Sequence, residues 1–392
     1  MTSAPAAAEP RFASEHAARG FRELEGEVIT PGLCTECRAC VDVCTADGPE
    51  ALALDLGRFD FCADRCTGCG LCYAVCPEVP WAGSEFERQF EIQATAIGKE
   101  RALTSATTKS PAIRSRSADG GVVTSLLWYL LDTNQIDGAI LSRGNGPVGS
   151  GSFLARTKGE ILQASGTRVG RGGTLSGSTE FVVNLDTVAF LRHLHRMDPD
   201  SRERLAMVGT PCQTYAIRRM QQLAVAPSRR VTVVLGLFCY EALPLNKVHW
   251  QRFEDATGLR VEDIERVQMR EDLVLTMRDG RTERIALDTA SLLAGPNCLR
   301  CADFSNRFAD IALGASGSDP GFTTVLARTE LGRGVLDGAL DAGYIAEWSS
   351  VFDSESREDV ESRLRTRLVE QTRRKVQLAR SDGVKTEKPP RC

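Results

Sequence analysis

Cys34-Thr-Glu-Cys-Arg-Ala-Cys-Val-Asp-Val-Cys44 and Cys66-Thr-Gly-Cys-Gly-Leu-Cys-Tyr-Ala-Val-Cys-Pro77 are the two stretches that decide how this sequence is interpreted. Each spaces four cysteines as C-x2-C-x2-C-x3-C, and the second is followed by the usual proline. Bacterial ferredoxins use this spacing to hold two 4Fe–4S clusters, and the fourth cysteine of each run binds the other cluster. The pattern therefore predicts one cluster on Cys34, Cys37, Cys40 and Cys76, and a second on Cys66, Cys69, Cys72 and Cys44.

The main alternative for these cysteines is a pair of zinc sites. Zinc proteins usually supply separated pairs of Cys or His ligands rather than four evenly clustered cysteines, so the spacing favours iron–sulfur clusters. Nine of the 14 cysteines lie between Cys34 and Cys76 in a chain of 392 residues, whereas disulfide-rich secreted proteins are usually short. Cys62 is expected to be a small buried residue rather than a ligand.

The overall composition excludes several classes of protein. A formal net charge of −4 gives no sign of a nucleic-acid partner. The longest apolar stretches, residues 122–131 and 231–240, fall short of the ~18–20 residues that a membrane span needs. The first thirty residues include Glu9, Arg11 and Glu15 and lack the apolar core of a secretion signal. We therefore expect a cytoplasmic protein without a membrane span.

The chain is predicted to divide into five segments. Residues 1–29 are interpreted as a flexible N-terminal arm, 30–90 as a bacterial-ferredoxin-like module with two 4Fe–4S clusters, and 91–117 as a polar linker. Residues 118–350 are expected to form a mixed α/β domain, and 351–392 a charged C-terminal helix and tail. The module has ten acidic and four basic residues, a local charge of −6. The fold class is thus α+β/α/β, a ferredoxin-like module joined to a mixed α/β domain.

Alternating helices and strands are predicted beyond residue 118. The expected helices are 121–132 and 212–223, and the expected strands are 139–142, 205–208, 231–238, 311–313 and 323–327. Asp279-Gly280 predicts a hairpin between residues 273–277 and 284–287. In the tail, Val360, Leu364, Leu368 and Val376 follow one helical stripe, and Arg373-Arg374-Lys375 is interpreted as a solvated helix face.

Four cysteines beyond the two runs are further candidate ligands. Cys212 lies at the start of a predicted helix, where a thiolate is favoured, and Cys239 follows a predicted strand. Cys298 and Cys301 form a C-x2-C pair. A third 4Fe–4S cluster and a zinc site would each use all four residues, whereas a redox dithiol would use only the last pair. The presence of two ferredoxin-type clusters favours a third cluster, because a relay needs another stepping stone.

Glycine-rich turns are candidates for binding a cofactor. Gly144, Gly146 and Gly149 spell G-x-G-x-x-G, but a strand rather than a helix is expected to follow, which argues against a dinucleotide fingerprint. Asp119-Gly-Gly-Val-Val-Thr124 opens a predicted helix, so its backbone could meet a phosphate or a flavin ring. Ser165-Gly-Thr-Arg168 is a second small basic loop.

These segments together resemble the beta-subunit family of coenzyme F420 (deazaflavin) hydrogenases and dehydrogenases over residues 30–348. The matching segments are 119–125, 136–139, Val208-Gly-Thr-Pro-Cys-Gln213, 237–239, Cys298-Leu-Arg-Cys-Ala-Asp-Phe304, 309–314 and 323–329. The resemblance implies FAD in the α/β domain and a 4Fe–4S cluster on Cys212, Cys239, Cys298 and Cys301. It also implies flavin contacts at Gly120, Gly121, Val122, Thr124, Gly166, Thr167, Arg168, Thr210, Pro211 and Gln213.

The cofactors predict an iron–sulfur flavoprotein oxidoreductase. A small-molecule hydride donor, with reduced coenzyme F420 favoured, would supply two electrons, and the clusters would pass them singly to ferredoxin or a redox partner subunit. Two alternatives stay open. Electrons could flow inward from ferredoxin to reduce another organic substrate, or the chain could be an electron-transfer subunit without a substrate of its own.

Overall fold

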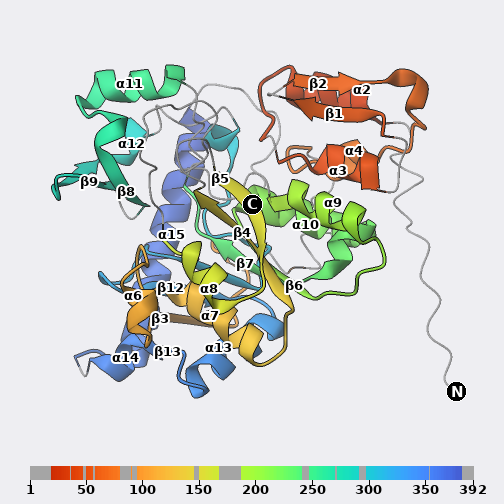
Figure 1. Ribbon diagram of the computed structural model, residues 1–392. Coiled ribbons are helices and arrows are strands. Elements are labelled where there is room, and N and C mark those ends of the chain that lie inside the picture. Colours follow the sequence, from red (N-terminus) through yellow and green to blue (C-terminus); the bar gives the residue numbers. More distant parts are fainter. Residues whose placement is uncertain are drawn as a thin grey trace, which may run out of the picture.

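The computed structural model describes residues 19–35, 37–46, 50–55, 58–79, 90, 95–144, 150–166, 187–240, 247–269, 272–290, 297–352 and 354–381. Figure 1 shows a small N-terminal module set against one side of a larger α/β domain. The fold class predicted from the sequence is confirmed at this level.

The N-terminal module is a layer of short helices beside a β-hairpin. Its helices are α2 (Phe21–Leu24), the π-helix η1 (Glu25–Ile29), α3 (Ala39–Ala46), the 3-10 turn η2 (Ala63–Arg65) and α4 (Leu71–Ala74). Strands β1 (Leu52–Asp55) and β2 (Arg58–Phe61) pair antiparallel. Both cysteine runs therefore end in a short helix, so each run is a loop closed by a helical turn.

The first residues of the described chain belong to this module, which corrects the prediction of a flexible arm over residues 1–29 for its described part, residues 19–29. Phe21, Leu24 and Val28 are 2–3% exposed and repeat at helical spacing. The ring of Phe21 stacks on Phe61 with centroids 4.6 Å apart. Three apolar residues among many charges give no strong periodic signal, so this stripe could not be predicted from the sequence. Residues 1–18 lie outside the described part of the chain.

Replacing Phe21 by alanine is expected to destabilise the module. Truncating a buried phenylalanine to alanine typically costs about 3–5 kcal/mol of the free energy of unfolding. Thermal unfolding of the full chain, followed by circular dichroism, measures the effect. Thr30→Ala, at an exposed position just after η1, is the matched control. An unchanged unfolding temperature for Phe21→Ala would restore the interpretation of this segment as a free arm.

The large domain is built on an eight-stranded sheet in the order β13-β3-β12-β11-β7-β6-β4-β5. Its strands, in that order, are Ile345–Glu347, Ala102–Thr108, Thr323–Ala327, Ile311–Gly314, Val231–Leu237, Leu205–Gly209, Gly138–Gly144 and Ser150–Ala155. The four central strands β11, β7, β6 and β4 run parallel, and the other pairings are antiparallel. The predicted strands in this sheet are all present, with ends that shift by one or two residues.

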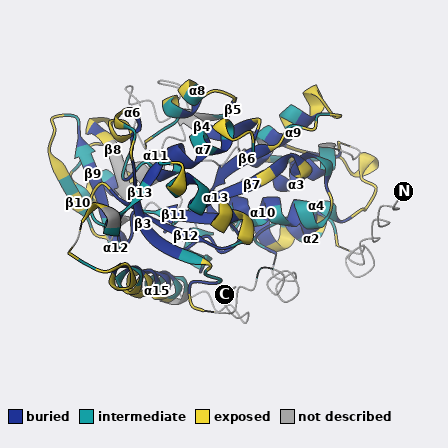
Figure 2. Cartoon of the chain, turned by 90° about the horizontal axis from the view of Figure 1, so that it is seen from below, coloured by how far each residue is buried: buried dark blue, intermediate teal, exposed yellow. Residues whose placement is uncertain are grey.

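Both faces of the sheet are covered, as Figure 2 shows by the dark blue of its strands. Alternate residues of a strand point to opposite faces. Ala206 and Val208 of β6 pack with α7 (Val122–Asp132), α8 (Lys158–Gln163) and α13 (Glu330–Asp341). Leu205 and Met207 face α9 (Thr187–Met197), α10 (Pro211–Gln222) and the cysteine-rich module, which share one hydrophobic core with them. The module is therefore packed onto the sheet domain rather than tethered beside it.

Strand β3 corrects the prediction of a linker over residues 91–117. It lies inside the sheet between β13 and β12. Its hydroxyl groups are buried and paired: Ser105 Oγ lies 2.7 Å from Ser318 Oγ, and Ser125 Oγ donates to Thr108 Oγ1 at 2.7 Å. The polar run indicated a connector, but threonine is a good strand former and these hydroxyls have partners inside the fold.

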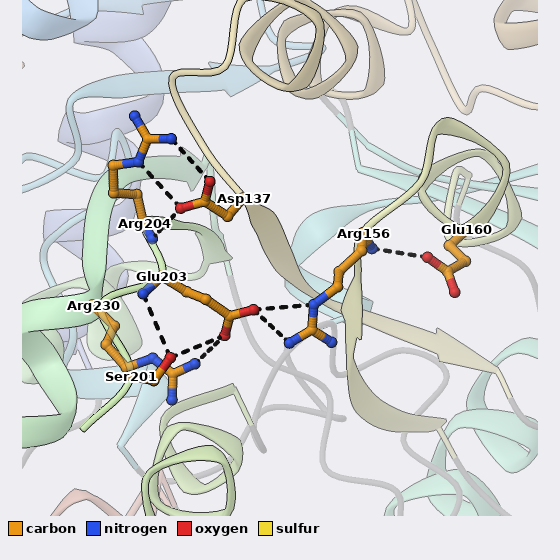
Figure 3. A network of polar contacts seen from close by, with 7 residues as sticks. All are labelled: Asp137, Arg156, Glu160, Ser201, Glu203, Arg204 and Arg230. Carbon is orange, nitrogen blue, oxygen red and sulfur yellow. Dashed lines mark hydrogen bonds and ion pairs between the residues drawn. The ribbon is translucent and has the colours of Figure 1, made fainter. Parts of the chain in front are cut away.

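The amino ends of the parallel strands are tied together by charged groups (Figure 3). Glu203 bridges Arg156 and Arg230, and Arg204 forks onto Asp137 through contacts of 2.9 and 3.1 Å. Burial acts to raise the pKa of Glu203, but the two guanidinium groups outweigh it and lower that pKa. These ion pairs stabilise the amino ends of the strands, whereas the cysteines Cys212 and Cys239 follow the carboxyl ends of β6 and β7.

The remaining elements complete the large domain. They are α6 (Pro111–Arg114), η5 (Ala226–Arg230), α11 (Lys247–Thr257), η6 (Val261–Asp263), β8 (Ile264–Met269), β9 (Leu273–Met277), β10 (Thr282–Ile285), α12 (Leu287–Ala290), η8 (Cys298–Arg300), α14 (Trp348–Val351) and α15 (Arg357–Ser381). The predicted hairpin is β9–β10, and Gly280 has the positive φ of +88° that its turn requires. Among the described helices, none combines the length and apolarity that crossing a lipid bilayer requires.

Helix α15 is part of the large domain's core. This corrects the prediction of a separate C-terminal segment for the described residues 357–381. Val360, Leu364 and Leu368 are 0–3% exposed and pack with Leu103 of β3 and Leu326 of β12. The predicted helical stripe is confirmed at these three positions. The prediction of a solvated face is wrong for Lys375, which is 3% exposed. Figure 1 shows the helix running the length of the large domain.

Candidate functional site

Four cysteines of the N-terminal module surround one pocket. Cys34, Cys37 and Cys40 come from the first run, and Cys76 ends the second run. The rest of the lining is largely apolar and comes from α2, η1, β2 and the loop before α3: Leu24, Val28, Ile29, Thr35, Arg38 and Phe59. An apolar shell limits the access of water to a bound cluster, which is one of the factors that set its potential.

The electrostatic neighbours of the thiols follow the crossed arrangement. Burial raises the pKa of Cys76, and the charges of Cys37 and Cys34 raise it further. Burial likewise raises the pKa of Cys44, with added contributions from Cys69 and Cys66. The last cysteine of each run thus lies among the first three cysteines of the other run.

Cys44, Cys66, Cys69 and Cys72 form the second group, and burial raises the pKa of two of its thiols, Cys72 and Cys44. Burial raises the pKa of Cys72 to about 12, and the charges of Cys69, Cys44 and Cys66 contribute. Metal coordination deprotonates a thiol outright. The raised pKa values of Cys44 and Cys72 fit an iron–sulfur cluster, whose irons supply the compensating charge.

The outer part of the module faces solvent. Cys66 and Cys69 are exposed, whereas Cys37 and Cys40 are buried. Cys62 is also exposed, so the prediction of a buried residue is wrong. It lies between β2 and η2, where the hairpin ends at the surface, and not inside the small core of the module.

The later cysteines gather at the carboxyl ends of the parallel strands. Cys212 lies in the first turn of α10, directly after β6, and its Sγ is 3.2 Å from Thr210 Oγ1. Cys239 follows β7, and its backbone N–H donates to Phe304 O at 2.9 Å. Cys298 begins η8 and Cys301 follows its last residue, and the N–H of Cys301 donates to Cys298 O at 3.2 Å. Strand topology and local turns therefore bring all four segments to one region.

The thiols of this group influence one another. Burial raises the pKa of Cys212 well above its usual range, and among nearby charges Cys239, Cys37 and Cys298 raise it. Burial also raises the pKa of Cys301, while the ammonium group of Lys375 opposes that change. We expected the start of a helix to favour the Cys212 thiolate, but desolvation outweighs this effect.

The first group of cysteines (Cys34, Cys37, Cys40 and Cys76) and the third group (Cys212, Cys239, Cys298 and Cys301) are neighbours. Cys37 is among the charges that act on Cys212, and Glu78 acts on both Cys76 and Cys301. Arg219, two turns after Cys212 on α10, donates from its guanidinium to the backbone O of Cys76. Helix α10 thus joins one candidate cluster site to the next.

Among the described residues, no group of three or more His, Cys, Asp or Glu side chains is arranged to hold a metal ion. A 4Fe–4S cluster is itself several atoms wide and stands between its four thiolates. Its ligands therefore surround a space, as Cys34, Cys37, Cys40 and Cys76 do, rather than converge on one point.

The predicted flavin contacts lie around the same edge of the sheet. Gly120 packs against β3 and β12, since a Cβ there would be 2.6 Å from Ala106 O and 2.7 Å from Thr323 N. Gly121, with φ +70°, caps α7. Thr210 and Pro211 begin α10 beside Cys212. Thr167 and Arg168 lie outside the described residues. Open α/β sheets bind ligands in crevices at this carboxyl edge.

Some predicted flavin residues already have a role in the fold. The side chain of Val122 is 1% exposed in the core under α7, and Thr124 is 7% exposed. Gln213 is fully buried, and its Oε1 accepts from the N–H of Thr210 at 3.3 Å in a capping box. Gly166 has a φ of +84° and lies against the backbone of Arg116. Gly120 is buried as well, and its N–H and O already bond to Thr323 Oγ1 and to the N–H of Thr108. The half-buried Gly121 is therefore better placed to meet a ligand than Gly120 or the side chains of Val122 and Gln213.

Comparison with known proteins agrees with this architecture. Residues 103–172 match the N-terminal part, and residues 202–350 the C-terminal part, of the family "Coenzyme F420 hydrogenase/dehydrogenase, beta subunit". Residues 26–77 match a 4Fe–4S dicluster domain. The two beta-subunit matches together span more than half of the chain.

Individual relatives belong to the same group. The coenzyme F420 hydrogenase subunit beta of Methanosarcina barkeri is 25% identical over 300 residues, which are 75% of this chain and 97% of the relative. The coenzyme F420-dependent sulfite reductase of Methanocaldococcus jannaschii is 25% identical over 325 residues, which are 78% of this chain but only 46% of that protein.

A solved structure shares the fold over much of the chain. A chain of the F420-reducing [NiFe] hydrogenase complex from Methanosarcina barkeri, studied as a xenon derivative, superposes with a TM-score of 0.60 at 23% identity. The match covers 74% of this chain and 93% of that chain. The chain therefore belongs to the coenzyme F420 hydrogenase/dehydrogenase beta-subunit family and carries a 4Fe–4S dicluster domain at its N-terminal side.

Proposed function

We propose that this protein is an iron–sulfur flavoprotein oxidoreductase that takes two electrons from reduced coenzyme F420 and delivers them singly to ferredoxin or a redox partner subunit. The observation that carries the proposal is the juxtaposition of three cysteine groups. Cys212 lies within electrostatic reach of Cys37, and Cys76 and Cys44 each lie among the cysteines of the opposite run. Such an arrangement suits a relay with three stations.

FAD is proposed at the carboxyl edge of the sheet, against the turns that precede α7 and α10. A bound flavin supplies the conversion between two-electron and one-electron chemistry. The backbone of Gly121 would face the cofactor, Gly120 would let that turn pack closely against β3 and β12, and Thr210 and Pro211 would hold Cys212 at the start of α10. The third cluster is proposed on Cys212, Cys239, Cys298 and Cys301, next to this edge.

The module is proposed to deliver the electrons. Its inner cysteine group, with Cys76, lies next to the third group, whereas Cys66 and Cys69 of the outer group are exposed. The local charge of −6 in residues 30–90 favours a partner that offers a basic surface. We expect this association to weaken as the salt concentration rises, because exposed charges are screened.

The proposal predicts that reduced coenzyme F420 bleaches both flavin and clusters. The test is an anaerobic titration of the reconstituted full chain, followed by the visible absorbance of FAD and of the iron–sulfur clusters. Both bands should fall as the reduced deazaflavin is added. If dithionite or reduced ferredoxin reduces the clusters but the deazaflavin does not, the deazaflavin would be excluded as direct donor to the isolated chain.

A second candidate is an electron-transfer subunit without a substrate of its own. It is favoured by the relatives, one named as a subunit and another solved as part of a hydrogenase complex. Turnover of reduced coenzyme F420 with an artificial acceptor separates the two candidates. An isolated catalytic chain turns over, whereas a pure relay requires its partner.

A further inference from the structure

A buried ammonium group lies beside the third cysteine group. Lys375 is on α15 and is 3% exposed. Its Nζ donates to the backbone O of Cys239 at 3.0 Å and to the backbone O of Tyr240. The side chain thus contacts the loop that presents one of the four proposed ligands.

The position of Lys375 is fixed by the helix that carries it. The N-terminal half of α15 is anchored in the core by Leu364 and Leu368. The helix packs along β3 and against η8, the turn between Cys298 and Cys301. Arg374 and Lys375 also lie 6.0 and 5.9 Å from the centroid of the Tyr240 ring. One helix therefore contacts both cysteine-bearing loops, from β7 and from η8.

Burying an ammonium group costs free energy unless nearby groups compensate for its desolvation. Two carbonyl oxygens supply part of that compensation here. A cluster bound by four thiolates is negatively charged and gains one more negative charge on reduction, so a nearby fixed cation favours the reduced state.

We propose that Lys375 is a positioning residue for the third cluster, which holds the Cys239–Tyr240 loop and raises the reduction potential of that cluster. This inference rests on the proposed cluster at Cys212, Cys239, Cys298 and Cys301. It assigns a redox role to a C-terminal helix that lies beyond the part of the chain matched by the family, which ends at residue 350.

The test compares three variants of the reconstituted full chain. Lys375→Gln removes the charge but keeps a hydrogen-bond donor, Lys375→Arg keeps the charge, and Arg373→Gln removes a charge from an exposed position of the same helix. Iron content and a redox titration monitored by electron paramagnetic resonance are measured for each. A Cys298→Ser variant identifies the signal of the third cluster.

Lys375→Gln should shift the potential of that one cluster to a more negative value and leave the other two unchanged. Lys375→Arg and Arg373→Gln should retain the original potential. Loss of the third cluster from Lys375→Gln, with its retention in Lys375→Arg, would also support the proposal. Unchanged potentials in a fully loaded Lys375→Gln protein would overturn it, and so would equal loss of the cluster from both Lys375 variants.

The failure of this inference is distinguishable from failure of the proposed function. If the wild-type chain holds iron for only two clusters, the proposed third cluster is rejected, and the proposed role of Lys375 is rejected with it. A chain with three clusters whose potentials do not depend on Lys375 would keep the proposed relay and reject only the role of the lysine.

Discussion

Replacing Cys212 by alanine should abolish the reduction of the dicluster module by reduced coenzyme F420, while dithionite still reduces the module. The half-buried Cys212 lies at the start of α10, where its thiol meets the charges of both Cys239 and Cys37. It therefore belongs to the proposed third cluster and also faces the module. Without this ligand, electrons would still reach the proposed flavin. The third cluster, which would carry them from the flavin to the cluster at Cys37, would be missing.

The measurement has two parts. Iron analysis should show a loss of about four iron atoms per chain, one cluster's content. Stopped-flow absorbance with reduced coenzyme F420 should show bleaching of the flavin but not of the two remaining clusters. Cys62→Ala is the matched control, because Cys62 is exposed and belongs to neither run. Cluster reduction in Cys212→Ala at the wild-type rate would exclude this residue from the path.

Much of this architecture could be predicted because the strongest signals are local. The two cysteine runs act through short loops, so their spacing alone indicates which chemistry the module supports. The strands β6, β7, β11 and β12 are short apolar runs, and a buried strand in a covered sheet has that pattern. The predicted helices over residues 121–132 and 212–223 correspond to α7 and α10.

The predictions were wrong where contacts with distant parts of the chain bury residues whose local sequence pattern indicates exposure. Residues 104–110 are polar, but Ser105 and Thr108 find hydroxyl partners on neighbouring elements and so form a buried strand. Phe21 belongs to the module only because β2 supplies Phe61 to cover it. Lys375 stands in a basic run that indicates solvent exposure, and only the return of α15 along β3 brings it to Cys239. Such contacts depend on topology, which the spacing of residues does not contain.

Cys76→Ala and Cys44→Ala should produce different defects, although the two residues hold the same place in their runs. Cys76 lies in the pocket with Cys34, Cys37 and Cys40, next to the third group. Its loss should interrupt electron flow before either cluster of the module is reduced by the deazaflavin. Cys44 lies among Cys69 and Cys66, so its loss should leave the inner cluster reducible and stop delivery to an external acceptor.

The comparison distinguishes the crossed arrangement from an uncrossed one. If each run bound its own cluster, Cys44→Ala would remove the cluster nearest Cys212, and Cys76→Ala would remove the exposed one. The two defects would then be exchanged. Iron content, bleaching by reduced coenzyme F420 and reduction of an external acceptor are measured for both variants in parallel. Because each substitution removes one half-buried thiol of the same module, each variant controls for a general loss of stability in the other, and the order of the stations can be determined from the pair.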